Sequence, residues 1–229
     1  MKLLAIETST ESCSAAAMVN DEIYVISEIA PRRHNEIILS MCEQVLAQGE
    51  ISITQLDFIS FGRGPGSFTG VRLAASVTQG IALAQDLPVV PVSSLAALAQ
   101  AAYKNYNASC VFPCIDARMQ EVYYAVYQLN SNKIMQLQGE EKVINPSLID
   151  AKISEHSIGM GSGWDAYTQI LHEKLGNITI FAHEFPQAEF VAQLGKNYFV
   201  QGQSVSAVQA IPVYIRDNVA VKPNRKISF

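Results

Sequence analysis

The segment FGRGPGSFTGVRLAAS, residues 61–76, joins an apolar strand to an apolar helix through a loop rich in glycine. The first N–H groups of a helix have no intrahelical partners and carry a partial positive charge, so this position attracts anions. Glycines would let the backbone approach a phosphate closely. A tight strand-to-helix turn would need the same glycines for packing, and no Gly-Lys-Ser/Thr of a Walker A loop follows. Both interpretations are open for the candidate phosphate-binding residues Gly64, Gly66, Ser67, Thr69 and Gly70.

Apolar periodicity on both sides of this segment predicts strands that alternate with helices. Asn35 is the expected N-cap of the first helix, and Gly49 is its expected stop. In the first half we expect strands at 3–9, 14–20, 22–29, 58–62 and 88–93, and helices at 35–48, 69–85 and 94–106. In the second half we expect strands at 110–116, 121–129 and 133–144, an apolar segment at 156–163, and helices at 164–175 and 189–201. The same order of elements occurs twice, which indicates an α/β protein whose sheets are partly parallel.

Composition narrows the class of protein. Hydrophobic residues make up 49% of the 229 residues and charged residues 16%, which favours a folded chain with a sizeable core. The net charge of −5 argues against a free-standing nucleic-acid-binding protein, which usually has a basic face. No apolar run reaches the roughly 18 residues of a membrane span, and the N-terminus lacks the features of a signal peptide, so we expect a cytoplasmic protein without a membrane partner. We expect inert thiols at Cys13, Cys42, Cys110 and Cys114.

Two of the predicted helices, at 35–48 and 69–85, are apolar on more than one face. A helix of this kind is normally covered on several sides. Either both helices are buried within the fold, or one face packs on the sheet and another meets a partner protein. The candidate interface residues are Ile38, Met41, Cys42, Val45, Leu73, Ala74, Val77 and Ile81.

The candidate catalytic groups are few. The four histidines, His34, His156, His172 and His183, form no pair with metal-ligand spacing, so we expect no metal site. Asp116, Arg118 and Glu121 are either an acid/base set or a turn held by local ion pairs. Glu7 and Thr8 end the first strand, where a carboxylate near hydroxyls can hold Mg²⁺ through water.

Six segments, taken in order, resemble the TsaB (YeaZ) family: IETST (6–10), RRHNEIIL (32–39), GPGSFTGVR (64–72), PVVPVSSLAALA (88–99), DARMQEVYYA (116–125) and PVYIR (212–216). The resemblance runs over nearly the whole chain. It implies an actin-like, sugar-kinase-like, Hsp70-like (ASKHA) fold with a five-strand mixed sheet in each of two lobes. We place these lobes at residues 1–105 and 106–229, and the terminal segment is a candidate for packing back on the first lobe.

The resemblance also implies a role without catalysis in making threonylcarbamoyladenosine at position 37 of tRNA. The implied partners are the catalytic subunit TsaD, bound through helices 35–48 and 69–85, and the ATPase TsaE. A homodimer through the same surface is an alternative, and tRNA would be met only through the complex. No intrinsic cofactor is implied, although ADP or ATP with Mg²⁺ at the boundary between subunits is an option.

Departures from active relatives favour the scaffold role. At 92–98, VSSLAAL has serine and leucine where TsaD has metal-binding histidines, and neither replaces imidazole as a ligand. Glu7 stands where the fold's first phosphate loop has aspartate, and the glycine of that loop is missing. The alternatives are an ATP-dependent kinase or hydrolase that uses the Gly64–Gly70 loop, and a metallo-glycoprotease, which the lack of a histidine pair disfavours. Direct tRNA binding would use Arg32, Arg33, Lys222, Arg225 and Lys226.

Overall fold

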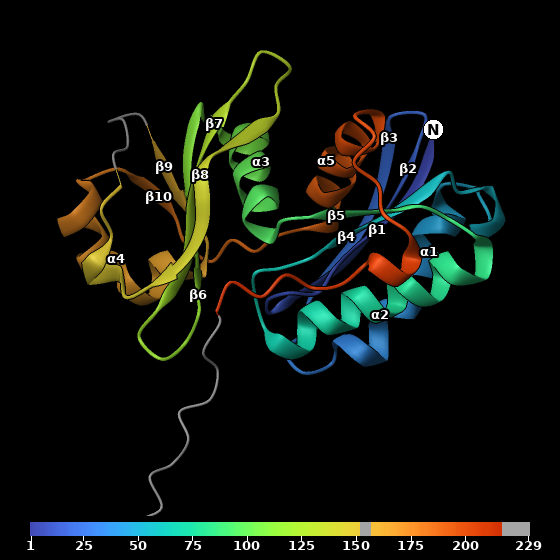
Figure 1. The fold of residues 1–229 in the computed structure, drawn as a ribbon, viewed down its shortest axis with the longest axis horizontal. Helices are drawn as coiled ribbons and strands as arrows, with labels where there is room; N and C mark the ends of the chain where they lie inside the picture. Colours follow the sequence, from blue (N-terminus) through green and yellow to red (C-terminus); the bar gives the residue numbers. More distant parts are fainter. Residues whose placement is uncertain (152–156, 217–229) are drawn as a thin grey trace, which may run out of the picture.

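The protein, described by a computed structural model over residues 1–151 and 157–216, consists of two five-stranded mixed sheets with helices between and outside them (Figure 1). In the first sheet the strand order is β3-β2-β1-β4-β5. Its strands are β1 (Lys2–Glu7), β2 (Ser12–Val19), β3 (Glu22–Ile29), β4 (Phe58–Gly62) and β5 (Val89–Val92). The first three strands are antiparallel, whereas β4 and β5 run parallel to β1.

The second sheet repeats this plan, with the order β10-β9-β6-β7-β8. Its strands are β6 (Cys110–Asp116), β7 (Val122–Leu129), β8 (Met135–Ile144), β9 (Ile158–Met160) and β10 (Thr179–Phe181). The strands β6, β7 and β8 are antiparallel, and β9 and β10 continue the sheet in parallel. The repeated element order and the expected fold class are therefore confirmed, although β10 is not among the predicted elements.

Five helices complete the layers: α1 (His34–Gln48), α2 (Phe68–Gln85), α3 (Ser94–Tyr106), α4 (Ser162–Leu175) and α5 (Ala188–Val200). One face of the first sheet is covered by α1 and α2, and its other face by α5. On the second sheet, α3 covers the face that looks toward α5, and α4 covers the opposite face. The helices α3 and α5 pack on each other, so a single helical layer lies between the two sheets.

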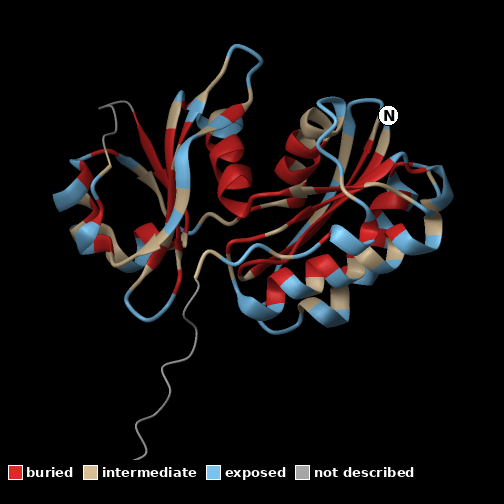
Figure 2. Ribbon diagram, in the orientation of Figure 1, coloured by how far each residue is buried: buried red, intermediate tan, exposed pale blue. Residues whose placement is uncertain are grey.

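Two helices pack on the sheet formed by the other half of the chain. The helix α3, placed by sequence in the first lobe, packs on β6, β7 and β8 of the second sheet. The helix α5, placed in the second lobe, packs on β1, β2, β4 and β5 of the first. A helix joins the sheet whose apolar face it covers, regardless of which strand precedes it in the chain. Figure 2 shows that the buried residues of both helices lie in the centre of the molecule, between the two sheets.

The core between the sheets is continuous. One cluster of buried apolar side chains takes members from β1, β5, α3, α5, β6 and β7. Around its rim, Glu141 of β8 binds three groups: it accepts hydrogen bonds from Ser93 and from the Tyr127 hydroxyl (2.9 Å), and pairs with Arg63 of the first lobe (3.0 Å). Only 7% of the Glu141 side chain is exposed, so the ion pair that ties the lobes together lies largely out of water.

The N-terminus of the first helix differs from expectation. The first helix begins at His34 rather than after an Asn35 cap, and its N-cap residue, Arg33, makes no side-chain capping bond. The stop near Gly49 is confirmed. In contrast, α3 has a capping serine, because Ser93 Oγ accepts hydrogen bonds from the backbone N–H groups of Leu95 and Ala96.

The segment after α5 returns to the first lobe. Val205 pairs with Val89 at the edge of β5, and the short helix η3 (Ala207–Gln209) lies against α2. The other 3₁₀ turns are η1 (Ile53–Gln55) and η2 (Pro146–Leu148). No helix in the described ranges is long and apolar enough to cross a lipid bilayer.

The four cysteines form no disulfide with one another in the structure. Cys13, Cys42 and Cys114 are buried, and burial raises the pKa of the Cys13 and Cys42 thiols to about 12. A thiol with such a pKa carries almost no thiolate near neutral pH and is a poor nucleophile. The burial agrees with the expected inert role.

The shared central layer generates a prediction about unfolding. Leu98 of α3 is fully buried in the core that joins both sheets, so Leu98→Ala should lower the free energy of unfolding by roughly 2–5 kcal/mol. Leu148→Ala is the matched control, because Leu148 is 66% exposed and its truncation should change stability by less than about 0.5 kcal/mol. Urea denaturation followed by circular dichroism measures both. Two separate transitions, with only one shifted by Leu98→Ala, would contradict a core common to both lobes.

Candidate functional site

The glycine loop before α2 packs directly on the loop after β1. The backbone N–H of Ser67 donates to the Ser9 carbonyl at 2.7 Å, and the Thr8 hydroxyl donates to the Gly70 carbonyl at 2.8 Å. A Cβ added at Gly66 would lie 2.3 Å from the Ser9 carbonyl oxygen, and one at Gly70 would lie 2.0 Å from that of Thr8. Both glycines are therefore required by the close approach of two backbone segments. The backbone of the loop after β1 occupies the space directly beside both glycines.

The other members of the candidate loop have ordinary structural roles. Gly64 has a φ of 95°, a left-handed conformation that disfavours side chains. Ser67 is the N-cap of α2, and its hydroxyl accepts from the Gly70 N–H at 3.4 Å. Thr69 is exposed in the first turn of the helix. The structure thus favours the packing interpretation of the loop over the phosphate-binding one.

Glu7 is fully buried at the end of β1, beneath this loop. One carboxylate oxygen accepts from the Ser9 N–H at 2.6 Å, and the other accepts from the Ser94 hydroxyl at 3.0 Å. Gly62 leaves the space for the carboxylate, since a Cβ there would lie 1.9 Å from an oxygen of Glu7. Burial raises the pKa of the Glu7 carboxyl above its ordinary value, and the hydrogen bonds from Ser9 and Ser94 oppose part of that rise.

A cleft of about 1090 Å³ opens between the two lobes beside these loops. The loop after β1 and the first turn of α2 line it on the first lobe, and the β6–β7 turn and the start of α4 line it on the second. The backbone from Val213 to Arg216 forms a further part of its wall. Polar and charged residues of the wall include Thr8, Ser9, Thr10, Glu11, Arg32, Asp116, Arg118, Ser162, Asp165 and Arg216.

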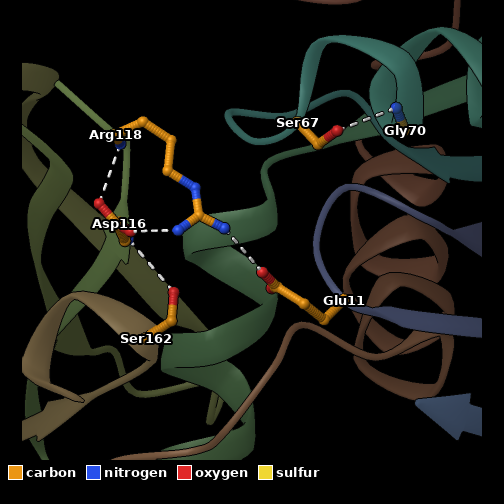
Figure 3. A network of polar contacts seen from close by, with 6 residues as sticks. All are labelled: Glu11, Ser67, Gly70, Asp116, Arg118 and Ser162. Carbon is orange, nitrogen blue, oxygen red and sulfur yellow. Dashed lines mark hydrogen bonds and ion pairs between the residues drawn. The ribbon is translucent and has the colours of Figure 1, made fainter. Parts of the chain in front are cut away.

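The segment DARMQE, residues 116–121, forms a turn held by ion pairs. This is one of the two alternatives for Asp116, Arg118 and Glu121, the other being an acid/base set. Arg118 pairs with Asp116 at 3.0 Å and reaches across the cleft to Glu11 at 3.2 Å (Figure 3). Ser162 Oγ accepts from the Asp116 N–H at 3.2 Å (Figure 3). Glu121 pairs with Arg216. Each carboxylate of this group has a guanidinium beside it, so the arrangement does not support an acid/base role.

These residues do not fit a nucleotide with Mg²⁺. Both oxygens of Glu7 accept hydrogen bonds inside the protein, and Gly66 and Gly70 lie against the backbone of Ser9 and Thr8. The hydroxyls of Ser9 and Thr10 are buried without a hydrogen-bond partner among the described residues, so some polar capacity remains at the cleft. Hydroxyls alone supply no charge to a divalent cation, whose usual ligands include carboxylates.

The predicted interface residues separate into two groups. Five of the eight, Ile38, Met41, Cys42, Val45 and Ala74, are at most 4% exposed and belong to the core between α1, α2 and the first sheet. The chain's own fold covers these five side chains. Leu73, Val77 and Ile81 are half-buried beside that core. A helix that is apolar all round gives no signal of which stripe faces inward, so periodicity alone could not separate the groups.

The outward surface of the two helices carries apolar residues that the sequence analysis did not select. Leu39 of α1 is 56% exposed and Leu83 of α2 is 62% exposed. Gly80, within α2, is exposed, and a Cβ built on it meets no described atom within 4 Å. We call the set Leu39, Leu73, Val77, Gly80 and Leu83 the outer stripe.

The histidines and basic residues are scattered. His34 lies near the Ser12 carbonyl (3.3 Å), His172 near the Gly176 carbonyl (3.2 Å), and His183 beside Asp165 (3.0 Å). His156, Lys222, Arg225 and Lys226 lie outside the described residues. Arg32 is exposed, and Arg33 pairs with Glu28 and Glu36. In the described ranges no group of three or more His, Cys, Asp or Glu side chains is placed to hold a metal ion.

Comparisons with known proteins agree over nearly the full chain. The sequence profile of a family described as "TsaD: tRNA N6-adenosine threonylcarbamoyltransferase" matches residues 16–223. The "tRNA threonylcarbamoyladenosine biosynthesis protein TsaB" of Haemophilus influenzae is 38% identical over 232 residues, with 97% of this chain and 96% of that protein covered. The protein of the same name from Escherichia coli is 36% identical over 225 residues, with 97% of each covered. The solved structure "YeaZ from Pseudomonas aeruginosa" superposes with a TM-score of 0.87 at 39% identity, over 93% of this chain and 99% of that one.

The two glycines of α2 allow a matched test of the loop. Gly70→Ala places a methyl group against the Thr8 carbonyl and should destabilise the protein by about 3 kcal/mol, at the upper end of overpacking costs. Gly80→Ala, in the same helix, meets open space and should stabilise the monomer by about 1 kcal/mol through helix propensity. Urea denaturation gives both values. Equal effects of the two substitutions would show that the glycine loop is not packed as described.

The burial of Glu7 generates a prediction about pH. The folded-state pKa of this carboxyl lies above its ordinary value of 4.5, so the folded protein holds the proton more tightly than the unfolded chain. The free energy of unfolding should therefore fall, relative to that of Glu7→Gln, as the pH rises from 4.5 through the folded-state pKa. Chemical denaturation at a series of pH values measures the difference. A wild type that gains stability over the variant across this range would mean that Glu7 is ionised and stabilised in the fold.

Proposed function

The chain belongs to the TsaB family of tRNA threonylcarbamoyladenosine biosynthesis proteins, and we propose that it serves there as a non-catalytic scaffold subunit that binds the catalytic subunit TsaD. In this role it holds TsaD in its active conformation and helps to recruit the ATPase TsaE. It meets tRNA only as part of that complex. The single observation that carries the proposal is the outer stripe of α1 and α2, whose apolar side chains the chain's own fold covers only in part.

The stripe has the composition of a surface that another chain covers. Leu39 and Leu83 each leave more than half of a large apolar side chain in water. Gly80 costs the helix about 1 kcal/mol relative to alanine and, within the described chain, packs against nothing. Exposed Ser76, Gly80 and Ala84 follow at intervals of four residues, so small side chains line one ridge of the helix. A second helix can approach such a ridge closely.

Sequence similarity between this chain and the TsaD family supports TsaD as the partner. The family profile that matches this chain is that of TsaD, so TsaD shares the fold and presents an equivalent pair of helices. Two related chains that meet through equivalent surfaces form a nearly two-fold interface, the commonest symmetry among oligomers. The same geometry permits two copies of this chain to pair, so the homodimer is the competing occupant of the stripe.

The cleft supports a role without chemistry of its own. Of its carboxylates, Asp116 and Glu11 pair with Arg118, and Asp165 lies beside His183; its glycine loop is packed on the loop after β1. A kinase or hydrolase would need a carboxylate free to hold Mg²⁺ beside a phosphate. Phosphate release from ATP by the purified chain, lost on Glu7→Ala, would favour that enzyme instead. Binding of ADP or ATP with Mg²⁺ at the boundary between subunits stays a prediction. It would require the partner to supply the ligands for the metal and the phosphates.

Two substitutions in the outer stripe test the docking surface without disturbing the fold. A Cβ at Gly80 meets no described atom within 4 Å and the position is exposed, so Gly80→Arg, which replaces glycine by a good helix former, should leave the isolated chain at least as stable as wild type. In a helix-to-helix interface the same arginine blocks the approach and should weaken binding to TsaD by roughly 100-fold. Leu83→Glu should act in the same direction, because it places a charge in an apolar contact.

Leu148→Glu is the matched control for Leu83→Glu, since Leu148 is equally exposed but lies on the second lobe. Binding is measured by calorimetry with purified TsaD, and function by reconstituted threonylcarbamoyl transfer to tRNA with TsaD, TsaE and the activated donor. If both stripe variants bind TsaD as tightly as wild type, the docking surface lies elsewhere. If transfer proceeds equally well without this chain, the scaffold role itself is refuted.

A further inference from the structure

The segment from Val213 to Arg216 crosses from the first lobe to the second at the cleft (Figure 1, red). At its start, the Val213 N–H donates to the Arg63 carbonyl of the first lobe at 2.9 Å. Tyr214 then lies beside the first turn of α2, with its ring centroid 6.2 Å from that of Phe68. The guanidinium of Arg72 is placed over the Phe68 ring at 3.3 Å and faces the Tyr214 ring at 5.4 Å. The segment is thus attached to the N-terminal end of α2 by aromatic and cation–π contacts.

At its end, the segment is anchored to the second lobe by one side chain. Arg216 donates to the Ala117 carbonyl at 3.1 Å and forms an ion pair with the Glu121 carboxylate. Its guanidinium also faces the Tyr123 ring at 5.9 Å. Only 16% of the Arg216 side chain is exposed. The two groups that it binds stand at the beginning and the end of the β6–β7 turn.

That turn is under backbone strain. Arg118, Met119 and Gln120 have φ values of 60°, 54° and 63°, so three successive residues that are not glycine adopt the left-handed conformation. Each is disfavoured for an L-residue, and a run of three persists only where the surroundings hold it in place. Backbone bonds between Ala117 and Glu121 and between Glu121 and Arg118 close the turn. Arg216 adds a clamp across both of its ends.

Arg118 offers a second tie between the lobes, through Glu11, but a weaker one. Its side chain is 75% exposed, so water and salt screen its attraction to Glu11. The Arg216 pair is mostly shielded from solvent and includes a hydrogen bond from a charged donor to a backbone carbonyl, which strengthens it. The segment 213–216, rather than the Arg118 bridge, is therefore the principal link between the strained turn and α2.

We propose that residues 213–216 form a strap that clamps the strained β6–β7 turn to the first turn of α2, with Arg216 as its positioning residue. When Arg216 is seated, the turn keeps its left-handed conformation and Tyr214 stays on Phe68 and Arg72. When Arg216 is released, the turn relaxes and the N-terminal end of α2 loses this support. Because α2 carries most of the outer stripe, the strap regulates the docking surface; this last step rests on the proposed function.

Hydrogen exchange on the full chain tests the strap directly. In Arg216→Ala, the amides of residues 117–121 and 68–73 should exchange at least about tenfold faster than in wild type, whereas those of α5 should not change. Arg216→Lys should give a smaller acceleration, because one ammonium group cannot reproduce the fork that reaches the Ala117 carbonyl and the Glu121 carboxylate together. Arg33→Ala is the matched control, since Arg33 forms only exposed ion pairs on the first lobe and should leave both segments unchanged.

Unchanged exchange at 68–73 in Arg216→Ala would overturn the strap, and so would an equal acceleration in every segment, which would indicate global destabilisation. If Arg216→Ala does not fold, Glu121→Gln takes its place, because it keeps the size of the side chain and weakens the ion pair; it should accelerate the same two segments to a lesser degree. The exchange measurement depends on no partner.

In a separate experiment, Arg216→Ala should weaken TsaD binding by roughly fivefold. An unchanged affinity would refute the regulatory step. Failure of the wild type to bind TsaD would refute the proposed function and leave the exchange result intact.

Discussion

Packing of α3 against α5 between the two sheets is the constraint on which the rest of the molecule depends. Nine successive residues of α3, from 94 to 102, are buried, which a helix can achieve only when neighbours surround it. Gly195 brings α5 close to β4, because a Cβ there would lie 2.6 Å from that of Ser60. With both inner faces filled by one helical layer and the rim tied by Glu141 to Arg63, the lobes are held at a fixed separation, and the cleft between them has a defined width.

An actin-like architecture of this kind ordinarily uses the cleft for chemistry, and here the same loops are used for packing. The glycines that in a nucleotide site make room for phosphate instead make room for the carbonyls of Thr8 and Ser9. The carboxylate of Glu7 is fully buried and accepts a hydrogen bond from Ser94 at the start of α3. The Glu7 carboxylate and the glycine loop both take part in packing contacts around the end of β1.

Much of the fold could be predicted from the sequence because its elements are locally encoded. The strand Phe58–Gly62 and the helix Ser94–Tyr106 match their predicted ranges, and the repeated order of elements indicates two similar sheets. The strand β10, Thr179–Phe181, has only three residues and too short a pattern to be distinguished from a loop. The exchange of α3 and α5 between lobes could not be predicted, because which sheet a helix covers is decided by long-range packing.

The candidate site was predicted less well for the same reason. Ile38 and Val45 look no different in sequence from Leu39 and Leu83, yet the first pair is buried and the second is exposed. The part of Arg216 in holding the β6–β7 turn depends on contacts across about a hundred residues of chain.

The position of α5 also affects the order in which the protein can fold during its synthesis on the ribosome. The strands of the first sheet, β1 to β5, are translated before α5, which covers their inner face, so that apolar face stays exposed on the nascent chain until residues 188–200 have been synthesised.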